Sequence, residues 1–451
     1  MLRQHSNPKM MNAPIPPTTA SRRDSVIRVQ IRRLARFLLP LLFLAAFCMP
    51  AGFAADSAGK EFIVSVDQAM WNKWGFQYPV TYIFDISGLS LGAKVSRRDN
   101  PSEGWKVLPK KAATNFFNGV ECVRFDYSGG RAFVSVGFGA DNSIELSFAN
   151  VTSARFVGVA RYYDDRKAAY TLSLDNWGRK ATANPGAAWH AADDDACDNY
   201  QAALRVCRGF KLPVSIAINT HMAGSNAMWN AMQQELDRRD FSWEPAVHAQ
   251  THPGNAKAYS ARGCKAEVLG CRDEILQHLR HIPFGQHVFE HILTSGYKDD
   301  AVLDTDAAEF LFVRGYNGRD TPANTDYAAW DAAHKFYGVG GLNPKDYDRV
   351  FKRRTPMGRF FAADVAELNA AFDRVHDAGG VCYAMWHPDR YLNSAIHDPR
   401  PGRDGVQGST LVQHLRHVAN RKDVWYVANG WLYSYRYIAE HATITGKATA
   451  E

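Results

Sequence analysis

The chain of 451 residues has 53 Lys and Arg against 46 Asp and Glu, a formal net charge of +7, and 46% of its residues are hydrophobic. The whole positive surplus lies in residues 1–54, which hold eight basic side chains and one acidic one, so residues 55–451 are neutral. A neutral body excludes the basic surface that tracking of nucleic-acid phosphates requires, and 12% aromatic residues exclude a disordered chain.

The first 54 residues have the pattern of an export signal. A basic stretch precedes the apolar run FLLPLLFLAAFCM at 37–49, and Gly52-Phe53-Ala54 places small residues before a cut after Ala54. The run is shorter than the roughly 20 apolar residues that a membrane-spanning helix needs. We therefore expect a signal peptide over 1–54 and an exported protein, periplasmic or extracellular, with no integral membrane span after its removal. The pattern leaves the Sec and Tat routes open.

Six cysteines remain after Cys48 is removed with the signal, and an even number in an exported chain permits disulfides. Cys264 and Cys271 enclose six residues and form the expected pair. Cys197 and Cys207 lie in one predicted helix, about 15 Å apart at 1.5 Å per residue, so we expect no bond between them.

Residues 55–165 are predicted to form an N-terminal β-domain. Short alternating segments are separated by polar turns such as Asn118-Gly119, and no helical period interrupts them. This pattern indicates an antiparallel, sandwich-like domain. The expected strands are 61–66, 80–86, 121–127, 131–138 and 143–148.

From residue 166 to 451 apolar strand-like segments alternate with helix-length segments, which indicates βα units on a parallel sheet. Seven strands are expected, enough to close a barrel, at 170–176, 212–219, 243–249, 310–316, 335–341, 380–387 and 424–429. The helical patterns lie at 197–210, 225–239, 364–380 and 410–420.

Reactive side chains end several of these strands. The first strand ends at Asp175-Asn176, the third is followed by His248 and His252 in the sequence HAQTH, the fourth contains Arg314 and the sixth ends at His387. Active sites of βα barrels lie at the carboxyl ends of the strands, so these side chains predict a catalytic centre there.

Two imidazoles at i and i+4 can bind one cation when a tight turn brings them together. An oxygen ligand from another strand would complete three protein ligands and leave positions open for water and substrate. A bound metal lowers the pKa of its water from near 16 to about 7 and polarises a carbonyl group. A carboxylate can accept the proton, and a second acid must protonate the departing amine.

This order of motifs resembles the NodB-homology polysaccharide deacetylases, carbohydrate esterase family four: Asp-Asn at the first strand, HxxxH after the third, an Arg further on and Trp386-His387 at a late strand. The resemblance covers about 168–435. It implies an α/β protein with a distorted (β/α)7 barrel, one divalent metal ion (zinc above all), and removal of acetyl groups from amino-sugar polymers.

Carried over by position, the resemblance makes Asp175 the catalytic base and His248 and His252 metal ligands. It makes His387 the late catalytic His and Arg314 the residue that orients the base. The family usually has a second Asp where this chain has Asn176. The third ligand is therefore Asn176, Asp175 itself, or a substitute from Asp193-Asp194-Asp195, with Asp194 as the candidate.

Other interpretations stay open. His278, His281, His287 and His291 form a rival cluster, which we set aside because no predicted strand end lies beside it. Trp177, Trp189, Trp243, Trp330 and Trp386 lie near strand ends, where indole rings could stack on sugars. The alternatives to polysaccharide N-deacetylation are a C–N hydrolase or O-deacetylase acting on another substrate, and a non-catalytic carbohydrate-binding relative.

Overall fold

The computed structural model describes residues 60–177, 193–223, 226–253, 259, 263–294, 300–316, 339–341, 362–386 and 410–447. The expected signal segment and the expected catalytic His387 lie outside these residues, as do the side chains of Asn176 and Asp194. The described residues belong to one compact unit, Phe53–Glu451. Among the described helices, none is both long and apolar enough to cross a bilayer.

The N-terminal region folds as an antiparallel β-structure, as the sequence predicts. The five expected strands are β1 (Glu61–Ser65), β2 (Val80–Ser87), β5 (Cys122–Asp126), β6 (Arg131–Val136) and β7 (Ser143–Ala149). The structure adds β3 (Lys94–Arg98), β4 (Lys106–Val107), β8 (Ser153–Val159), the helix α2 (Gln68–Trp74) and the short 3₁₀ turn η1 (Tyr163–Asp165).

These strands form two sheets that share one core. The order is β5-β6-β2-β8 in one sheet and β17-β1-β7-β3-β4 in the other. The ring of Phe84 from the first sheet lies 4.9 Å from that of Phe62 and 4.8 Å from that of Phe148, both from the second. The edge strand β17 (Thr443–Gly446) comes from the far end of the chain and pairs antiparallel with β1.

The second half of the chain forms the predicted parallel sheet. Its order is β14-β13-β12-β11-β10-β9-β15, and β16 also pairs with β9. The strands are β9 (Ala168–Trp177), β10 (Val214–Ile218), β11 (Trp243–Val247), β12 (Glu290–Ile292), β13 (Phe312–Tyr316), β14 (Val339–Gly341), β15 (Val381–Trp386) and β16 (Val424–Tyr426). The α/β class is therefore confirmed.

The sheet departs from a regular barrel in two ways. On one edge of β9, β16 pairs with the first residues and β10 with the last ones, so the edge is divided between two strands. The outer strands β14 and β15 approach each other, but no ladder joins them among the described residues. The sheet is thus a curled, incompletely closed barrel.

The count of seven parallel strands was wrong, because the structure has an eighth, β12. This strand is only three residues long and carries the polar side chains of Glu290 and His291. A strand this short gives no alternating pattern to detect. This strand matters because it lies between β11, which His248 and His252 follow, and β13, which contains Arg314.

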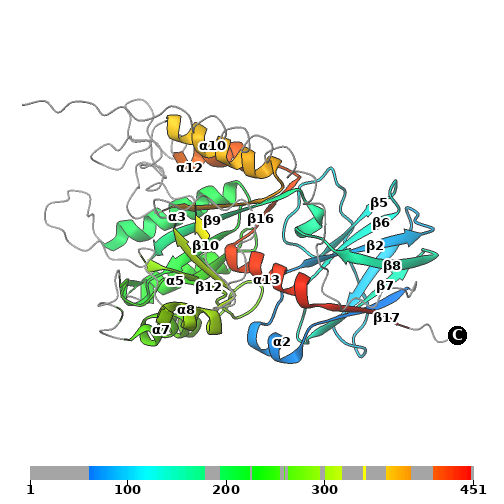
Figure 1. Ribbon diagram of the computed structural model, residues 1–451, viewed down its shortest axis with the longest axis horizontal. Coiled ribbons are helices and arrows are strands. Elements are labelled where there is room, and N and C mark those ends of the chain that lie inside the picture. The colour runs from blue at the N-terminus through cyan, green and yellow to red at the C-terminus, as the bar shows by residue number, and fades with distance from the viewer. Residues whose placement is uncertain are drawn as a thin grey trace, which may run out of the picture. The chain divides into compact units, whose positions relative to one another are not determined.

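Helices surround the parallel strands (Figure 1). Those that the sequence predicts are α3 (Asp193–Gly209), α5 (Asn226–Leu236), α10 (Ala362–Asp377) and α12 (Thr410–Val418). The structure adds α4 (Thr220–Ala223), α7 (Cys264–His278), α8 (Asp300–Glu309) and α13 (Asn429–His441).

The two faces of each parallel strand differ in chemistry. Leu172 and Leu174 of β9 and Ile216 of β10 belong to the apolar core that packs against the helices. The residues between them, such as Ser173 and Ser215, are buried on the opposite, enclosed face. On β9 and β10 the enclosed face therefore carries small and polar side chains, and the same face holds Asp175.

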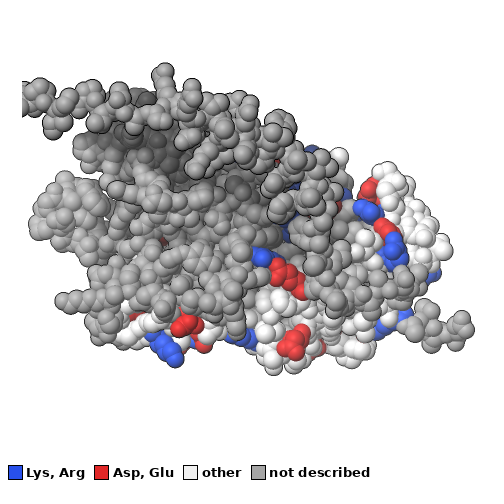
Figure 2. Space-filling model, viewed as in Figure 1, with Lys and Arg blue, Asp and Glu red and all other residues white. Residues whose placement is uncertain are grey.

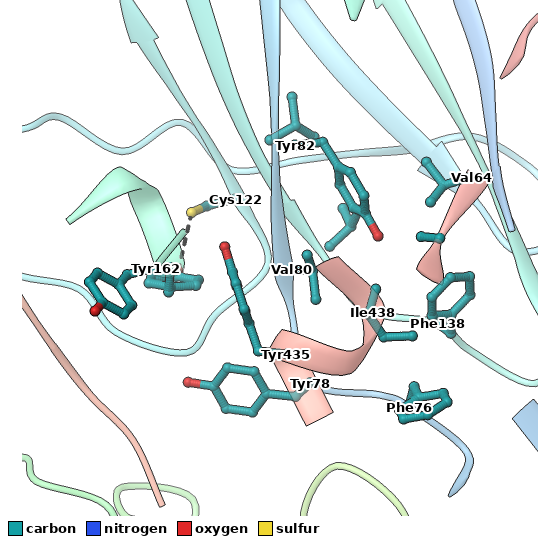
Figure 3. Packing of buried hydrophobic residues seen from close by; sticks show 14 of the residues in the cluster. Val64, Phe76, Tyr78, Val80, Tyr82, Cys122, Phe138, Tyr162, Tyr435 and Ile438 are labelled. Atoms are coloured by element: carbon teal, nitrogen blue, oxygen red, sulfur yellow. Dashed lines mark hydrogen bonds between the residues drawn. The ribbon is translucent and has the colours of Figure 1, made fainter. Parts of the chain in front are cut away.

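Helix α13 joins the parallel sheet to the antiparallel sheets. Its residues Tyr435 and Ile438 lie beside Tyr78 and Val80 in a single core (Figure 3). The same core contains Phe312 of β13, so the two regions bury apolar surface against each other.

The expected disulfide between Cys264 and Cys271 is absent. Both residues lie in α7 and both are free thiols. Seven residues of helix separate them by about 10 Å, which is too far for a disulfide. A helix over 264–278 carries almost no amphipathic pattern in its sequence, so the interpretation of this stretch as a disulfide loop was wrong.

We expect Ile444→Ala to destabilise the protein, because Ile444 is buried on β17 and its register partner is Val64 of β1. Removing a buried Ile side chain costs about 2–4 kcal/mol of unfolding free energy. The exposed neighbour Thr445 supplies the control, since Thr445→Ala should change stability by less than about 0.5 kcal/mol. Denaturant unfolding measures both; equal effects would show that β17 does not belong to the core.

Candidate functional site

Asp175 and Arg314 form a buried ion pair across the enclosed face of the sheet. Asp175 lies near the carboxyl end of β9 and Arg314 lies in β13, and both side chains are almost fully buried. Nη2 of Arg314 donates to both carboxylate oxygens of Asp175. The guanidinium therefore favours the charged carboxylate in a place where burial alone would disfavour it.

Neighbouring side chains fix this pair. Nη1 of Arg314 lies 3.0 Å from Sδ of Met385 on β15. The hydroxyl of Tyr200 on α3 donates to the backbone carbonyl of Asp175. The ring of Tyr200 in turn stacks on Trp177, with centroids 5.2 Å apart. These contacts of Asp175, Arg314 and Trp177 fix the position of the carboxyl end of β9.

The expectation that tryptophans near the strand ends could stack on sugars is wrong for Trp177 and Trp243. Trp177 and Trp243 are fully buried in the core rather than open to a sugar ligand. Trp189, Trp330 and the side chain of Trp386 lie outside the described residues. None of the described tryptophans near the strand ends therefore offers a stacking surface.

His248 is held in one tautomer. Its Nδ1 lies 2.6 Å from the carbonyl oxygen of Ile292 on β12, and a carbonyl only accepts hydrogen bonds. Nδ1 therefore carries the proton, and the lone pair of the ring is on Nε2. Burial, followed by the charge of His252, lowers the pKa of His248 well below 6.5, so the imidazole is neutral. A neutral imidazole that donates one N–H to a backbone carbonyl is the usual state of a metal-ligating histidine.

His252 faces His248 across a tight loop. The two ring centroids are 4.9 Å apart and the planes are inclined by 75°. Ala249 and His252 both have left-handed backbone angles, with φ of 60° and 59°. Two such residues within one short loop coil the backbone, and this coiling brings the i and i+4 side chains together as the sequence analysis requires.

Two residues that the sequence analysis missed hold this loop in place. Asn219 follows β10, and its Nδ2 donates to the carbonyl oxygens of His248 and Ala249. Glu267 of α7 accepts hydrogen bonds from the amide and the hydroxyl of Thr251, at 2.9 and 2.7 Å. Both residues are fully buried. A Glu within a weakly patterned helix and an Asn after a strand give no signal of this role in the sequence.

The structure thus places four of the expected residues at the carboxyl ends of the strands, in two groups. Asp175 with Arg314 forms one group, and His248 with His252 forms the other. Asn219 follows the strand that lies between β9 and β11. The remaining candidates, His387 and the side chains of Asn176 and Asp194, lie outside the described residues, although α3 begins at Asp193.

A metal ion held by the protein requires several side-chain ligands that converge on one point. Within the described part of the chain, no three side chains of His, Cys, Asp or Glu gather in a way that could hold a metal ion. The two histidines suit such an ion, since the tautomer of His248 leaves the lone pair on Nε2, the atom that would bind the metal. Both oxygens of Asp175 are bonded to Arg314, which disfavours Asp175 as a ligand. Oδ1 of Asn219 is buried without a hydrogen-bond partner and is a further oxygen donor in this region.

The rival histidine cluster does not assemble. His278 stacks on Trp229, with ring centroids 4.6 Å apart, and His281 lies 3.5 Å from Asp237. His291 bonds to Asp306 on α8. The reason given for setting this cluster aside was partly wrong, since His291 does lie in a strand, β12.

Charge is mixed on the described surface. In the view of Figure 2, Lys and Arg are interspersed with Asp and Glu on the described part of this face. This distribution agrees with the neutral net charge of residues 55–451.

Comparison with known proteins returned matches by structure alone. No protein-family model and no curated protein matches the chain. A solved structure from Mycobacterium smegmatis, titled as a polysaccharide deacetylase, is 13% identical, covers 65% of this chain and 98% of its own, and has a TM-score of 0.43. Peptidoglycan deacetylase PdaC from Bacillus subtilis is 12% identical, with coverages of 60% and 91% and a TM-score of 0.31.

A third similar structure is described as a pseudoenzyme of carbohydrate esterase family four from Bacillus anthracis. It is 12% identical, with coverages of 62% and 69% and a TM-score of 0.33. Of these three structures, the one from Bacillus anthracis is described by the name of this family, and the similarity of all three to this chain is low.

We expect Arg314→Ala to lower the unfolding free energy by about 3–5 kcal/mol, because it leaves the buried carboxylate of Asp175 without its counter-charge. The control is Arg131→Ala. Arg131 is exposed and pairs with the partly exposed Asp85 at 3.2 Å, so its loss should cost less than about 1 kcal/mol. Similar losses in the two variants, measured by denaturant unfolding, would contradict the buried pair.

Proposed function

We propose that this protein is an exported, divalent-metal-dependent deacetylase that hydrolyses N-acetyl groups of an amino-sugar polysaccharide. On this proposal it is a divergent member of the NodB-homology family. The observation that carries the proposal is the arrangement at the strand ends. A tautomer-fixed, neutral His248 faces His252, and a carboxylate held in its charged form by Arg314 lies at the same edge of the sheet.

The two imidazoles are the residues that would hold the metal ion. The oxygen donor would come from Asn176 or Asp194, or from Asn219, whose Oδ1 is buried without a partner. Asp175 is the least suited of the candidates, since both of its oxygens are engaged. A divalent ion at this position, zinc above all, supplies Lewis acidity and lowers the pKa of bound water.

The protein's own residues would divide the proton transfers between them. Asp175, kept ionised by Arg314, would accept a proton from the attacking water at a carboxylate oxygen. His387 would protonate the departing amine. The antiparallel β-domain would position the catalytic region on polymer or cell wall. An acetamide on a polysaccharide meets both demands of such a site, a carbonyl to polarise and an amine to release.

One observation favours a second candidate, a non-catalytic carbohydrate-binding relative. The usual second Asp of the first strand is replaced by Asn176. Such a relative would bind glycans without holding a stoichiometric ion. A C–N hydrolase or O-deacetylase would hold the ion but act on small amides or O-acetyl esters instead.

We expect the purified protein to bind one divalent ion and to release acetate from N-acetylglucosamine polymers. His248→Ala should lose both the ion and the activity, because it removes a ligand. His278→Ala serves as control, since His278 stacks on Trp229 outside the site and should leave both unchanged. Elemental analysis and an acetate assay over chitin oligomers, peptidoglycan, O-acetylated glycans and small amides decide between the candidates. Full metal content in His248→Ala would refute the assignment.

We also expect Asn219→Ala to weaken metal binding by about 10–100-fold, the usual effect of removing a group that positions a ligand. The reason is that Asn219 holds the backbone of His248 and Ala249. The matched control is Asn118→Ala, because Nδ2 of Asn118 likewise donates to a backbone carbonyl, that of Tyr426. Metal titration by calorimetry should separate the two; an unchanged affinity in Asn219→Ala would show that the loop keeps its shape without this side chain.

A further inference from the structure

Two glutamates are buried on the enclosed face of the parallel sheet, at the opposite end from the histidines. Glu244 is the second residue of β11 and Glu290 is the first residue of β12, and their exposed fractions are 2% and 0%. The strands are neighbours, and Val247 is paired with His291. In this register Glu290 lies opposite Ala246, two residues along β11 from Glu244.

One carboxylate oxygen of each glutamate accepts hydrogen bonds. The donors come from Ser215 and from the first turn of α13. Oε1 of Glu244 accepts the hydroxyl of Ser215 at 2.7 Å and the amide of Gly430 at 2.6 Å. Oε1 of Glu290 accepts Nδ2 of Asn429 at 2.9 Å. The amide of Asn429 in turn donates to the Ser215 hydroxyl, at 2.8 Å. The two carboxyl groups thus converge on Ser215 and on the first turn of α13.

The other oxygen of each glutamate, Oε2, is buried and has no hydrogen-bond partner. Neither glutamate forms an ion pair with any of the described residues. The charged group that attracts Glu290 most is Arg314 of β13, which is bonded to Asp175 of β9. From the segment before β2, Tyr78 also faces Glu244, and burial raises the pKa of its phenol so that it stays neutral.

Two unpartnered carboxylate oxygens in one dry cluster require something positive between them, because two adjacent buried negative charges repel strongly. A carboxylic acid that donates to a carboxylate satisfies both oxygens with a single proton. We propose that Glu244 and Glu290 share one proton, and that this pair is a proton-dependent latch for the N-terminus of α13.

The N-terminus of α13 explains how the pair can carry one negative charge. Ala428, the N-cap of α13, makes no side-chain cap bond, so Glu244 takes that role with its bond from Gly430. A negative charge at a helix N-terminus is stabilised by the helix dipole. A Cβ on Gly430 would lie 2.7 Å from Oε2 of Glu244, so glycine is what lets the helix approach this closely.

Burial raises the pKa of Glu290 to about 7, although the charge of Arg314 and hydrogen bonds from Asn429 and Ser215 act in the opposite direction. Burial, and then the charge of Glu290, raises the pKa of Glu244 as well. Loss of the shared proton to solvent leaves two carboxylates side by side beneath α13. Since α13 packs on the antiparallel sheets through Tyr435 and Ile438 (Figure 3), the latch links proton binding to the junction of the two regions.

The sign of the pH dependence follows from the direction of the shift. Between pH 4.5, the ordinary value of Glu290, and about pH 7, the folded protein binds the proton more tightly than the unfolded chain. Stability therefore falls as the pH rises through this window and levels off above it. The inference does not depend on the proposed reaction, because its readout is stability rather than catalysis.

The test is Glu290→Gln, which imitates the protonated form. Its thermal midpoint should match wild type at pH 5 and exceed it by at least about 2 °C at pH 8. The infrared band of a protonated carboxyl group that disappears in wild type between pH 6 and 8 should be missing from the variant. If Glu290→Gln is destabilised equally at all pH values, the ionised form of Glu290 is required and the shared proton is refuted.

Glu145→Gln is the matched control. Glu145 is a buried glutamate on β7 that pairs with Arg98 and Lys447. Burial alone would raise the pKa of its carboxyl group, but the two cations outweigh burial and lower the pKa below its ordinary value. Its variant should lose stability above pH 4.5 and regain it in acid, opposite in sign to Glu290→Gln.

A second variant protects the test against a folding failure of Glu290→Gln. In Glu244→Gln the negative neighbour of Glu290 is gone, so the pKa of Glu290 should fall and the stability loss should move to lower pH if the pair is coupled as proposed. A shift to lower pH supports the latch, and an unchanged or higher pH overturns it. A cation retained by wild type after chelation and absent from Glu290→Gln would also overturn it, since a metal would then occupy the place of the proton.

Discussion

A single arginine balances the buried carboxylates of the parallel sheet. Arg314 is bonded to Asp175 near the carboxyl ends of the strands, and its charge also attracts Glu290 near the amino ends. In a closed, dry interior an unbalanced charge is costly, so every negative group there needs a cation, a proton or a helix terminus. Arg314 is bonded to Asp175, the N-terminus of α13 is bonded to Glu244, and on our proposal Glu244 and Glu290 share a proton. The charge state of the enclosed face follows from this division.

The same enclosed face requires small side chains. Ser173, Ser215 and Ala217 leave room for Arg314 to extend inside the sheet and for α13 to reach the amino ends of the strands. Larger apolar residues occupy the alternate positions, where the helices cover them. The strand alternation thus separates stability on the outer face from chemistry on the enclosed one.

Contacts from other segments of the chain hold the histidine loop in its conformation. The backbone of β12 sets the tautomer of His248, Asn219 holds the carbonyl oxygens of the loop, and Glu267 fixes Thr251. All three contacts come from segments distant in sequence. A loop with two left-handed residues is strained, and contacts of this kind are what keep such a conformation in place.

The sequence by itself determined the class of fold and the neighbourhood of the site. Period-two segments before residue 165 and alternating strands and helices after it required antiparallel and parallel sheets, and the carboxyl ends of parallel strands must lie at one edge. From this rule the sequence predicts that Asp175, His248, His252 and Arg314 lie at the same edge of the sheet. These features depend on local periodicity, which the chain carries in each segment separately.

Only the tertiary structure decided the features that join distant segments. The three-residue strand β12, the pairing of β17 with β1, and the roles of Asn219 and Glu267 have no local pattern, because each depends on a partner far along the chain. The free state of Cys264 and Cys271 likewise follows from a helix whose sequence has almost no amphipathic period. The charge division among Asp175, Arg314, Glu244 and Glu290 is the clearest case, since burial and proximity, which set it, exist only in the folded chain.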